Sequence, residues 1–170
     1  ILKLMNRKYS RSEYIQKVEF IRKHIPDIGI TADIIVGFPT ETEADFLETI
    51  SLLDICKLDN VYSFKYSPRE GTMAFKNLKD DVSKEEKEKR LEILHSFNEK
   101  IALQLNEQLI NQTQDVLWEN TKIYKDKELL EGRTSSFKKI FADFKDNKIG
   151  EISKVKIISA SANSLVGEIL

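Results

Sequence analysis

The residue whose type and surroundings most suggest chemistry is Asp33. It lies in the run 30–37, ITADIIVG, whose β-branched apolar residues predict a buried strand. A carboxylate in such a strand is costly unless it is paired or faces a cavity. Because strand side chains alternate, Ile35 and Gly37 share the face of Asp33. We therefore predict a ligand-facing strand; a structural ion pair at Asp33, with core and turn roles for Ile35 and Gly37, is the alternative.

Two arginines at expected loop positions could hold an anion. Arg7 precedes the first predicted helix, and Arg69 lies in the loop 68–72, PREGT. A guanidinium can bind a carboxylate or a phosphate through two parallel hydrogen bonds. Solvated charges at Arg7 and a loop salt bridge at Arg69 are the alternatives.

A second cationic group, near the end of the chain, has the residue types that bind RNA. It consists of Arg133, Phe137, Lys138 and Lys139, around one predicted turn. A planar cation and an aromatic ring beside further positive charge suit phosphate contact and base stacking. Residues 111–170 hold 10 Lys and Arg against 9 Asp and Glu, so net charge alone does not predict RNA binding.

Other chemical motifs are absent from the sequence. There is no CxxxCxxC run, no phosphate-binding loop and no nucleophile-elbow motif. The only cysteine, Cys56, lies in an apolar helical run and is predicted to be a core residue. His95, alone on a long predicted helix, is expected to be structural or solvated. Motifs by themselves therefore predict no catalytic centre.

The first part of the chain alternates between helical and strand patterns. A capping box, Ser10 with Glu13, begins a helix that Pro26 ends, and strand 30–37 follows. A further helix, strand 61–66 and a long helix to about residue 109, begun by the box Ser83 with Glu86, complete the pattern. Such alternation predicts parallel βα units, and two strands are too few for a stable parallel sheet. We expect residues 1–110 to be part of a larger α/β domain.

The pattern changes after residue 110. Five short strand-like runs, separated by polar or glycine-containing turns, occupy 113–170. Closing five short strands into a barrel removes exposed sheet edges, so we predict a small antiparallel β-barrel over 111–170, with Trp118 in its core.

Bulk composition excludes few functions. The chain has 170 residues, with 27 Lys and Arg and 28 Asp and Glu. Its net charge is close to zero and therefore does not indicate a nucleic-acid partner. No apolar stretch reaches the roughly 20 residues that cross a membrane, and no signal peptide is visible, so a cytoplasmic location is expected. The first residue is Ile1, which suggests a segment of a longer chain.

Four segments, in order, resemble the radical-SAM tRNA methylthiotransferase family. They are MNRKYSR at 5–11, TADIIVGFPTETEADF at 31–46, FKYSPREGT at 64–72 and GRT at 132–134. The resemblance covers essentially the whole chain. It implies the C-terminal half of such an enzyme: the end of a radical-SAM (βα) barrel followed by an RNA-binding TRAM domain, an OB-like barrel.

The resemblance also implies a reaction and its cofactors. S-adenosyl-L-methionine (SAM) is cleaved reductively, and the resulting radical activates a dimethylallyl-modified adenosine next to the anticodon for addition of sulfur and a methyl group. Two [4Fe–4S] clusters and a reductant such as flavodoxin or ferredoxin are implied, with tRNA as partner and no membrane. The cluster cysteines would lie outside this segment, so the segment alone is expected to be inactive.

Residue roles follow from the resemblance in the same way. Asp33, Ile35, Gly37 and Arg7 would contact SAM, and Arg69 and the group around Arg133 would contact RNA. Two positions depart from the family's usual residues, Thr40 in place of Gly and Ala32 in place of Thr or Ser. Neither is expected to conflict with the fold.

Two other substrates and one other class of protein remain open. Related enzymes act on threonylcarbamoyl-adenosine in tRNA or on an aspartate of a ribosomal protein. SPREGT and Asp33 favour the tRNA branches, and GRT favours the dimethylallyl-adenosine branch. A non-enzymatic RNA-binding module is the alternative class.

Overall fold

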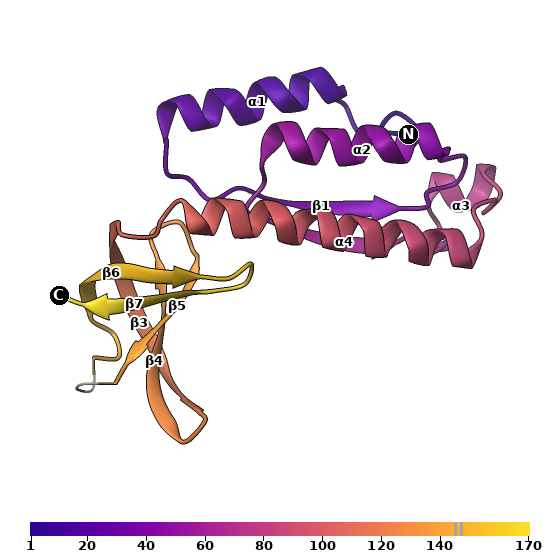
Figure 1. The fold of residues 1–170 in the computed structure, drawn as a ribbon. Coiled ribbons are helices and arrows are strands. Elements are labelled where there is room, and N and C mark those ends of the chain that lie inside the picture. The colour runs from indigo at the N-terminus through magenta and orange to yellow at the C-terminus, as the bar shows by residue number, and fades with distance from the viewer. Residues whose placement is uncertain (145, 147) are drawn as a thin grey trace. The chain divides into compact units, whose positions relative to one another are not determined.

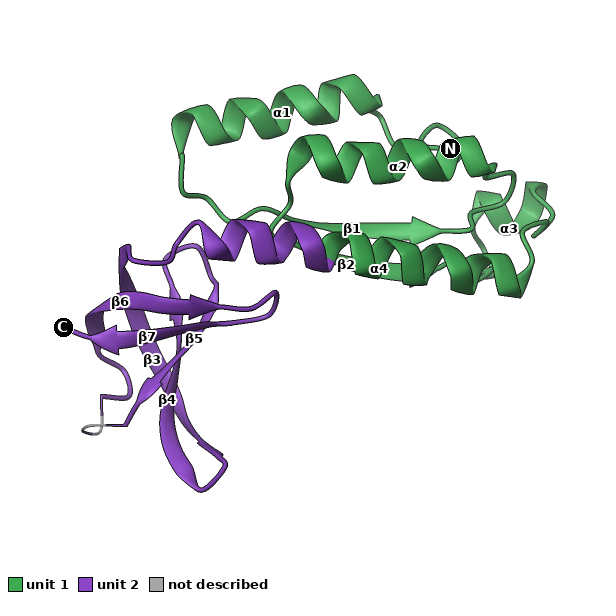
Figure 2. Cartoon of the chain, viewed as in Figure 1, with its two compact units in different colours: residues 1–98 green, residues 99–170 purple. Residues whose placement is uncertain are grey.

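The computed structural model describes residues 1–144, 146 and 148–170. These residues form two compact units, 1–98 and 99–170 (Figure 1, Figure 2). The first unit holds α1 (Arg11–His24), β1 (Thr31–Val36), α2 (Glu43–Cys56), β2 (Asn60–Lys65), α3 (Met73–Asn77) and the start of α4 (Lys84–Glu107). The second holds the end of α4, β3 (Thr113–Tyr124), β4 (Lys127–Thr134), β5 (Lys139–Asp143), β6 (Ile152–Ala160) and β7 (Leu165–Ile169). The units divide inside α4, and the predicted domain boundary near residue 110 stays a prediction.

The predicted alternation of helices and strands is confirmed in the first unit, with α3 as an addition. Ser10 accepts the backbone N–H of Glu13 at 3.3 Å, and the Glu13 carboxylate accepts that of Ser10 at 2.7 Å, so the first capping box is complete. Only half of the second forms. The Ser83 hydroxyl accepts the N–H of Glu86 at 3.1 Å, but the Glu86 carboxylate turns to Arg90.

The sheet of the first unit has one covered face and one open face. β1 and β2 pair in parallel, with Asp33 opposite Tyr62 and Ile35 opposite Phe64. Val36 and Val61 are buried on the covered face, and α1 and α2 both lie on one side of β1 (Figure 1). The residues that alternate with these along each strand point to the opposite side of the sheet. We call four of them the open face: Asp33, Ile35, Tyr62 and Phe64.

The second unit is a five-stranded sheet that closes on itself in the order β3-β4-β5-β7-β6. Four of its five pairings are antiparallel, but β5 and β7 pair in parallel, so the expectation of a wholly antiparallel barrel is wrong at this seam. The third of the strand-like runs, KIFADFK at 139–145, forms β5 only as far as Asp143, and its last residue lies outside the described residues. The apolar core consists of Val116, Trp118, Leu130, Ile140, Ala142, Val155, Ile157 and Leu165. Trp118 is fully buried, as predicted.

Candidate functional site

Three of the four predicted cofactor residues line one cavity in the first unit. The cavity has a volume of about 660 Å³ and is lined by Arg7, Asp33 and Ile35, with further residues from the N-terminal segment and α2. Asp33 is exposed, so its carboxylate avoids the cost of burial that the apolar run suggested. Arg7 and Asp33 place charges of opposite sign at the same cavity.

Gly37 has a packing role that the sequence did not reveal. It is buried with φ +68°, and a Cβ atom built there would lie 2.3 Å from Cγ of Lys87. The Lys87 stem therefore fills the space that the missing side chain leaves. Gly37 does not line the cavity, and its predicted contact with a cofactor stays a prediction.

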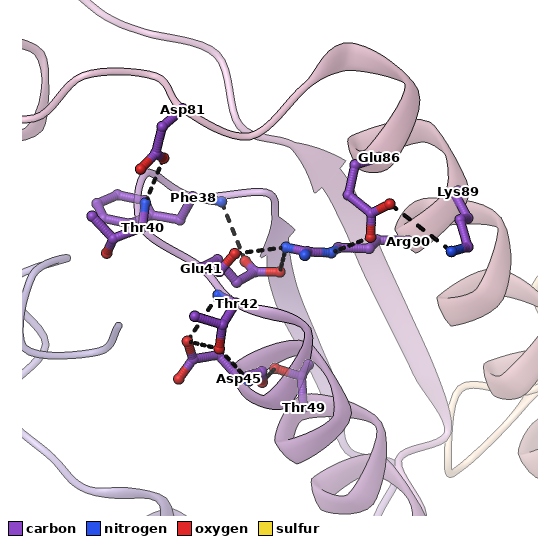
Figure 3. A network of polar contacts seen from close by, with 10 residues as sticks. All are labelled: Phe38, Thr40, Glu41, Thr42, Asp45, Thr49, Asp81, Glu86, Lys89 and Arg90. Carbon is purple, nitrogen blue, oxygen red and sulfur yellow. Dashed lines mark hydrogen bonds and ion pairs between the residues drawn. The ribbon is translucent and has the colours of Figure 1, made fainter.

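The loop 37–42, between β1 and α2, is held by a buried ion pair with α4 (Figure 3). Arg90 Nη1 lies 2.9 Å from Glu41 Oε1, and both side chains are 6% exposed. The same nitrogen donates to the Glu41 carbonyl at 3.1 Å, and Arg90 Nε donates to Glu86 at 3.0 Å. The other Glu41 oxygen accepts the N–H of Phe38 at 3.2 Å. The carboxyl end of β1 is thus held by α4.

The last residue of this loop, Thr42, is also the N-cap of α2. Thr42 caps that helix, since its hydroxyl accepts the N–H of Asp45 at 3.2 Å. Hydrogen bonds from the Thr42 hydroxyl, and then from its backbone N–H, hold the pKa of the Asp45 carboxyl below its usual value. Thr42 and Asp45 thus form a complete capping box, which positions the start of α2.

The backbone of Thr40 is strained. The expectation that threonine at this position does not conflict with the fold is therefore wrong. Its φ is +73°, in the left-handed region that β-branched residues avoid. Its N–H donates to Asp81 Oδ1 at 2.7 Å, which holds the strained turn in place. The family's usual glycine would adopt this φ freely.

Thr40→Gly is therefore expected to raise the free energy of unfolding by about 1 kcal/mol, since relief of left-handed strain exceeds the entropy that glycine adds to the unfolded chain. The backbone N–H that contacts Asp81 is retained. Urea unfolding monitored by circular dichroism measures the change. Thr42→Gly is the matched control: its φ is −81° and its hydroxyl caps α2, so it should lower stability. Destabilisation by Thr40→Gly would contradict the strain assignment.

Arg69, the first predicted RNA contact, lies in the loop after β2. Its carbonyl accepts the hydroxyl of Thr72 at 2.8 Å, which orders the loop before α3. The Arg69 side chain is exposed, and no ion pair to it is found in the described part of the chain. The loop salt bridge, which was the alternative for Arg69, is therefore not formed among these residues, and the RNA contact stays a prediction.

The predicted cluster in the second unit assembles around Arg133. The guanidinium carbon of Arg133 lies 4.3 Å from the ring centroid of Phe137, whose side chain is 73% exposed. Arg133 Nε also lies 3.1 Å from Glu119, and Lys139 Nζ lies 3.6 Å from Glu131. Lys138 stands on the same turn, and its N–H donates to the Thr134 hydroxyl at 3.1 Å. The cluster presents a ring stacked on a cation, with part of its charge neutralised by carboxylates.

Two groups of residues in the first unit were not expected from the sequence. Tyr62 and Phe64, at alternate positions of VYSFKY, are 55% and 54% exposed on the open face. Their alternation was a readable signal. Glu41 and Arg90 are separated by 49 positions, and nothing local indicates their pairing. Cys56 behaves as predicted, since it is buried and burial raises the pKa of its thiol.

The described residues add two observations about cofactors and membranes. They contain no group of three or more His, Cys, Asp or Glu side chains arranged to hold a metal ion. Among them, too, no helix combines the length and apolar character needed to span a membrane.

The whole chain is homologous to part of a class of curated enzymes that act on tRNA. The relatives are named tRNA-2-methylthio-N(6)-dimethylallyladenosine synthase. They include proteins of Bacteroides fragilis (39% identical over 99% of the chain), Thermotoga petrophila (41% over 100%) and Syntrophus aciditrophicus (44% over 100%). The chain spans 36%, 38% and 36% of their lengths. No protein-family model matches the chain. The resemblance found in the sequence is confirmed.

Proposed function

We propose that this chain is the C-terminal part of a radical-SAM methylthiotransferase that acts on dimethylallyl-adenosine in tRNA. The observation that carries the proposal is homology over the whole chain to synthases named for this nucleoside. In this reading, the first unit is the end of the radical-SAM barrel and the second is the TRAM domain. The homologues' names support the dimethylallyl branch over the threonylcarbamoyl and ribosomal-protein branches.

The residues of the first unit fit SAM. The cavity volume of about 660 Å³ falls in the range that small-molecule sites occupy. Arg7 would hold the SAM carboxylate, Asp33 would accept hydrogen bonds from its polar donors, and Ile35 would supply an apolar contact. Gly37 would act indirectly, by letting Lys87 pack against the carboxyl end of β1. When bound, SAM and the clusters supply the radical, the sulfur and the methyl group.

The residues of this chain do not fit an iron–sulfur cluster. Such a cluster needs several cysteine thiolates, and the one cysteine of the chain is buried in an apolar core. Both clusters would therefore be held by residues outside these 170. A flavodoxin or ferredoxin would supply electrons.

The proposal is tested with the full-length enzyme that carries this chain, after cluster reconstitution. It should convert dimethylallyl-adenosine in tRNA to the methylthio product, detected by mass spectrometry of nucleosides. Asp33→Asn should weaken SAM binding by about tenfold, the loss of one charge-assisted hydrogen bond, with an unchanged melting temperature. The 170-residue chain alone should cleave no SAM. A wild-type enzyme that binds tRNA but forms no methylthio product would favour the RNA-binding module instead.

The Arg133 cluster is proposed to hold RNA through a few contacts. Simultaneous replacement of Arg133, Lys138 and Lys139 by Ala should weaken tRNA binding by the full-length enzyme and leave SAM cleavage without tRNA intact. With three or four phosphates contacted, the barrel should contribute a slope of log affinity against log salt of about −2 to −3. The variant should lose that part of the slope.

The matched control replaces Lys154 and Lys156 by Ala. Both are exposed on β6, which neighbours neither β4 nor β5 in the barrel. Equal loss of affinity in both variants would show that the barrel attracts RNA only by diffuse charge.

A further inference from the structure

We propose that Lys87 is a positioning residue for the reaction: its ammonium group holds Tyr66, and with it the loop that follows β2, in the arrangement that turnover of tRNA requires. The inference rests on the proposed function and deepens it. It assigns different roles to the two parts of one buried side chain, the stem beside Gly37 and the ammonium group beside Tyr66 and Asp80.

Lys87 reaches the edge of the sheet at which both strands end. β1 ends at Val36 and β2 at Lys65. The Tyr66 N–H donates to the Val36 carbonyl at 2.8 Å, so the loops after the two strands start side by side. In barrels of alternating strands and helices, active sites lie at the carboxyl ends of the strands, on such loops. A residue that fixes this edge can therefore act on the site without lining it.

The Lys87 side chain contacts three segments at this edge. Its stem fills the space at Gly37, in the loop after β1. Its Nζ lies 5.3 Å from the centroid of the Tyr66 ring, in the loop after β2, and 2.5 Å from Asp80 Oδ1, in the segment before α4. The Tyr66 ring in turn meets that of Phe38 edge-on, with centroids 5.1 Å apart. One side chain therefore joins segments that follow both strands.

The burial of Lys87 distinguishes a positioning role from a stabilising one. The Lys87 side chain is only 8% exposed, and the loss of hydration of a buried ammonium group offsets much of what an ion pair contributes. The Asp80 side chain is 31% exposed, so its carboxylate can be hydrated when the cation is removed. An apolar residue of similar length is therefore expected to stabilise the fold about as well as Lys87 does.

The contact between the ammonium group and the Tyr66 ring links Lys87 to the proposed RNA contact. A cation over a ring face favours one placement of that ring. Tyr66 begins the loop 66–72, which carries Arg69. Loss of the cation would allow this loop to shift. Misplacement of a positioning group by about 1 Å can cost about a hundredfold in rate, even far from the chemistry.

The test uses Lys87→Met in the full-length enzyme with reconstituted clusters. The unbranched methionine side chain still fills the space at Gly37, so SAM affinity and melting temperature should be retained. Loss of the ammonium group should lower kcat/KM for tRNA by about tenfold or more, because the loop after β2 is no longer held. Mass spectrometry of nucleosides over a series of tRNA concentrations gives kcat/KM. Lys89→Met, which removes a 65% exposed lysine from the same helix, is the matched control and should change none of the three quantities.

A second variant tests whether Lys87 acts through Tyr66. Tyr66→Leu should lower kcat/KM by a similar factor, and Lys87→Met/Tyr66→Leu should be no worse than the weaker of the two single variants, because the residues act as a unit. Additive losses would overturn the inference, as would normal turnover by Lys87→Met.

A purely structural role for Lys87 gives a different result. SAM affinity, melting temperature and turnover would then fall together in Lys87→Met, which would also overturn the inference. A wild-type enzyme that binds tRNA but forms no methylthio product would instead count against the proposed function.

Discussion

Arg90→Met is expected to lower the free energy of unfolding by about 3–5 kcal/mol, because it leaves a carboxylate buried without its cation. Glu41 would keep only the N–H of Phe38 at 3.2 Å, with its side chain 6% exposed. The substitution also removes the contact of the guanidinium with the Phe46 ring, 5.7 Å from its centroid. Urea unfolding at neutral pH measures the loss.

Two variants separate the buried charge from the lost packing. Glu41→Gln/Arg90→Met removes both charges and keeps an acceptor for Phe38, so it should recover much of the stability lost in the single variant. Lys65→Met breaks an ion pair with Glu88 in which both side chains are exposed, and should cost far less. Equal effects of Arg90→Met and Lys65→Met would show that the buried pair does not stabilise the loop.

Trp118→Ala should destabilise the barrel by about 3–5 kcal/mol, the usual cost of truncating a large buried aromatic residue. Trp118 is fully buried and is the largest side chain of the barrel core. Its indole N–H has no hydrogen-bond partner among the described residues. Trp118→Phe, which removes that N–H and keeps most of the ring, should therefore cost much less than Trp118→Ala.

Thermal unfolding followed by circular dichroism measures both tryptophan variants, since neither retains the only tryptophan of the chain. The same variants distinguish a core residue from a base-stacking platform. For a core residue, Trp118→Phe should leave tRNA affinity unchanged. A large loss of tRNA affinity in a stable Trp118→Phe protein would place the indole at the RNA surface and contradict its burial.

The sequence by itself determined those features that depend on residues close together in the chain. The capping box at Ser10, the shared face of Asp33 and Ile35, and the meeting of Arg133 with Phe137 across one turn all follow from local spacing. The five strands after residue 110 follow from alternation and turn residues. In each of these local contacts the groups are separated by only a few residues, so the geometry of a helix, a strand or a single turn brings them together.

Only the tertiary structure decided the contacts between distant segments. Arg90 reaches Glu41 across 49 positions, Asp81 reaches Thr40 across 41, and β5 pairs with β7 in parallel at the barrel seam. The strain at Thr40 and the burial of Lys87 over Gly37 arise from these long-range contacts. Their partners are selected by how helices and strands pack, which no local pattern encodes. For the same reason the open face became visible only when the pairing of β1 with β2 placed Tyr62 beside Asp33.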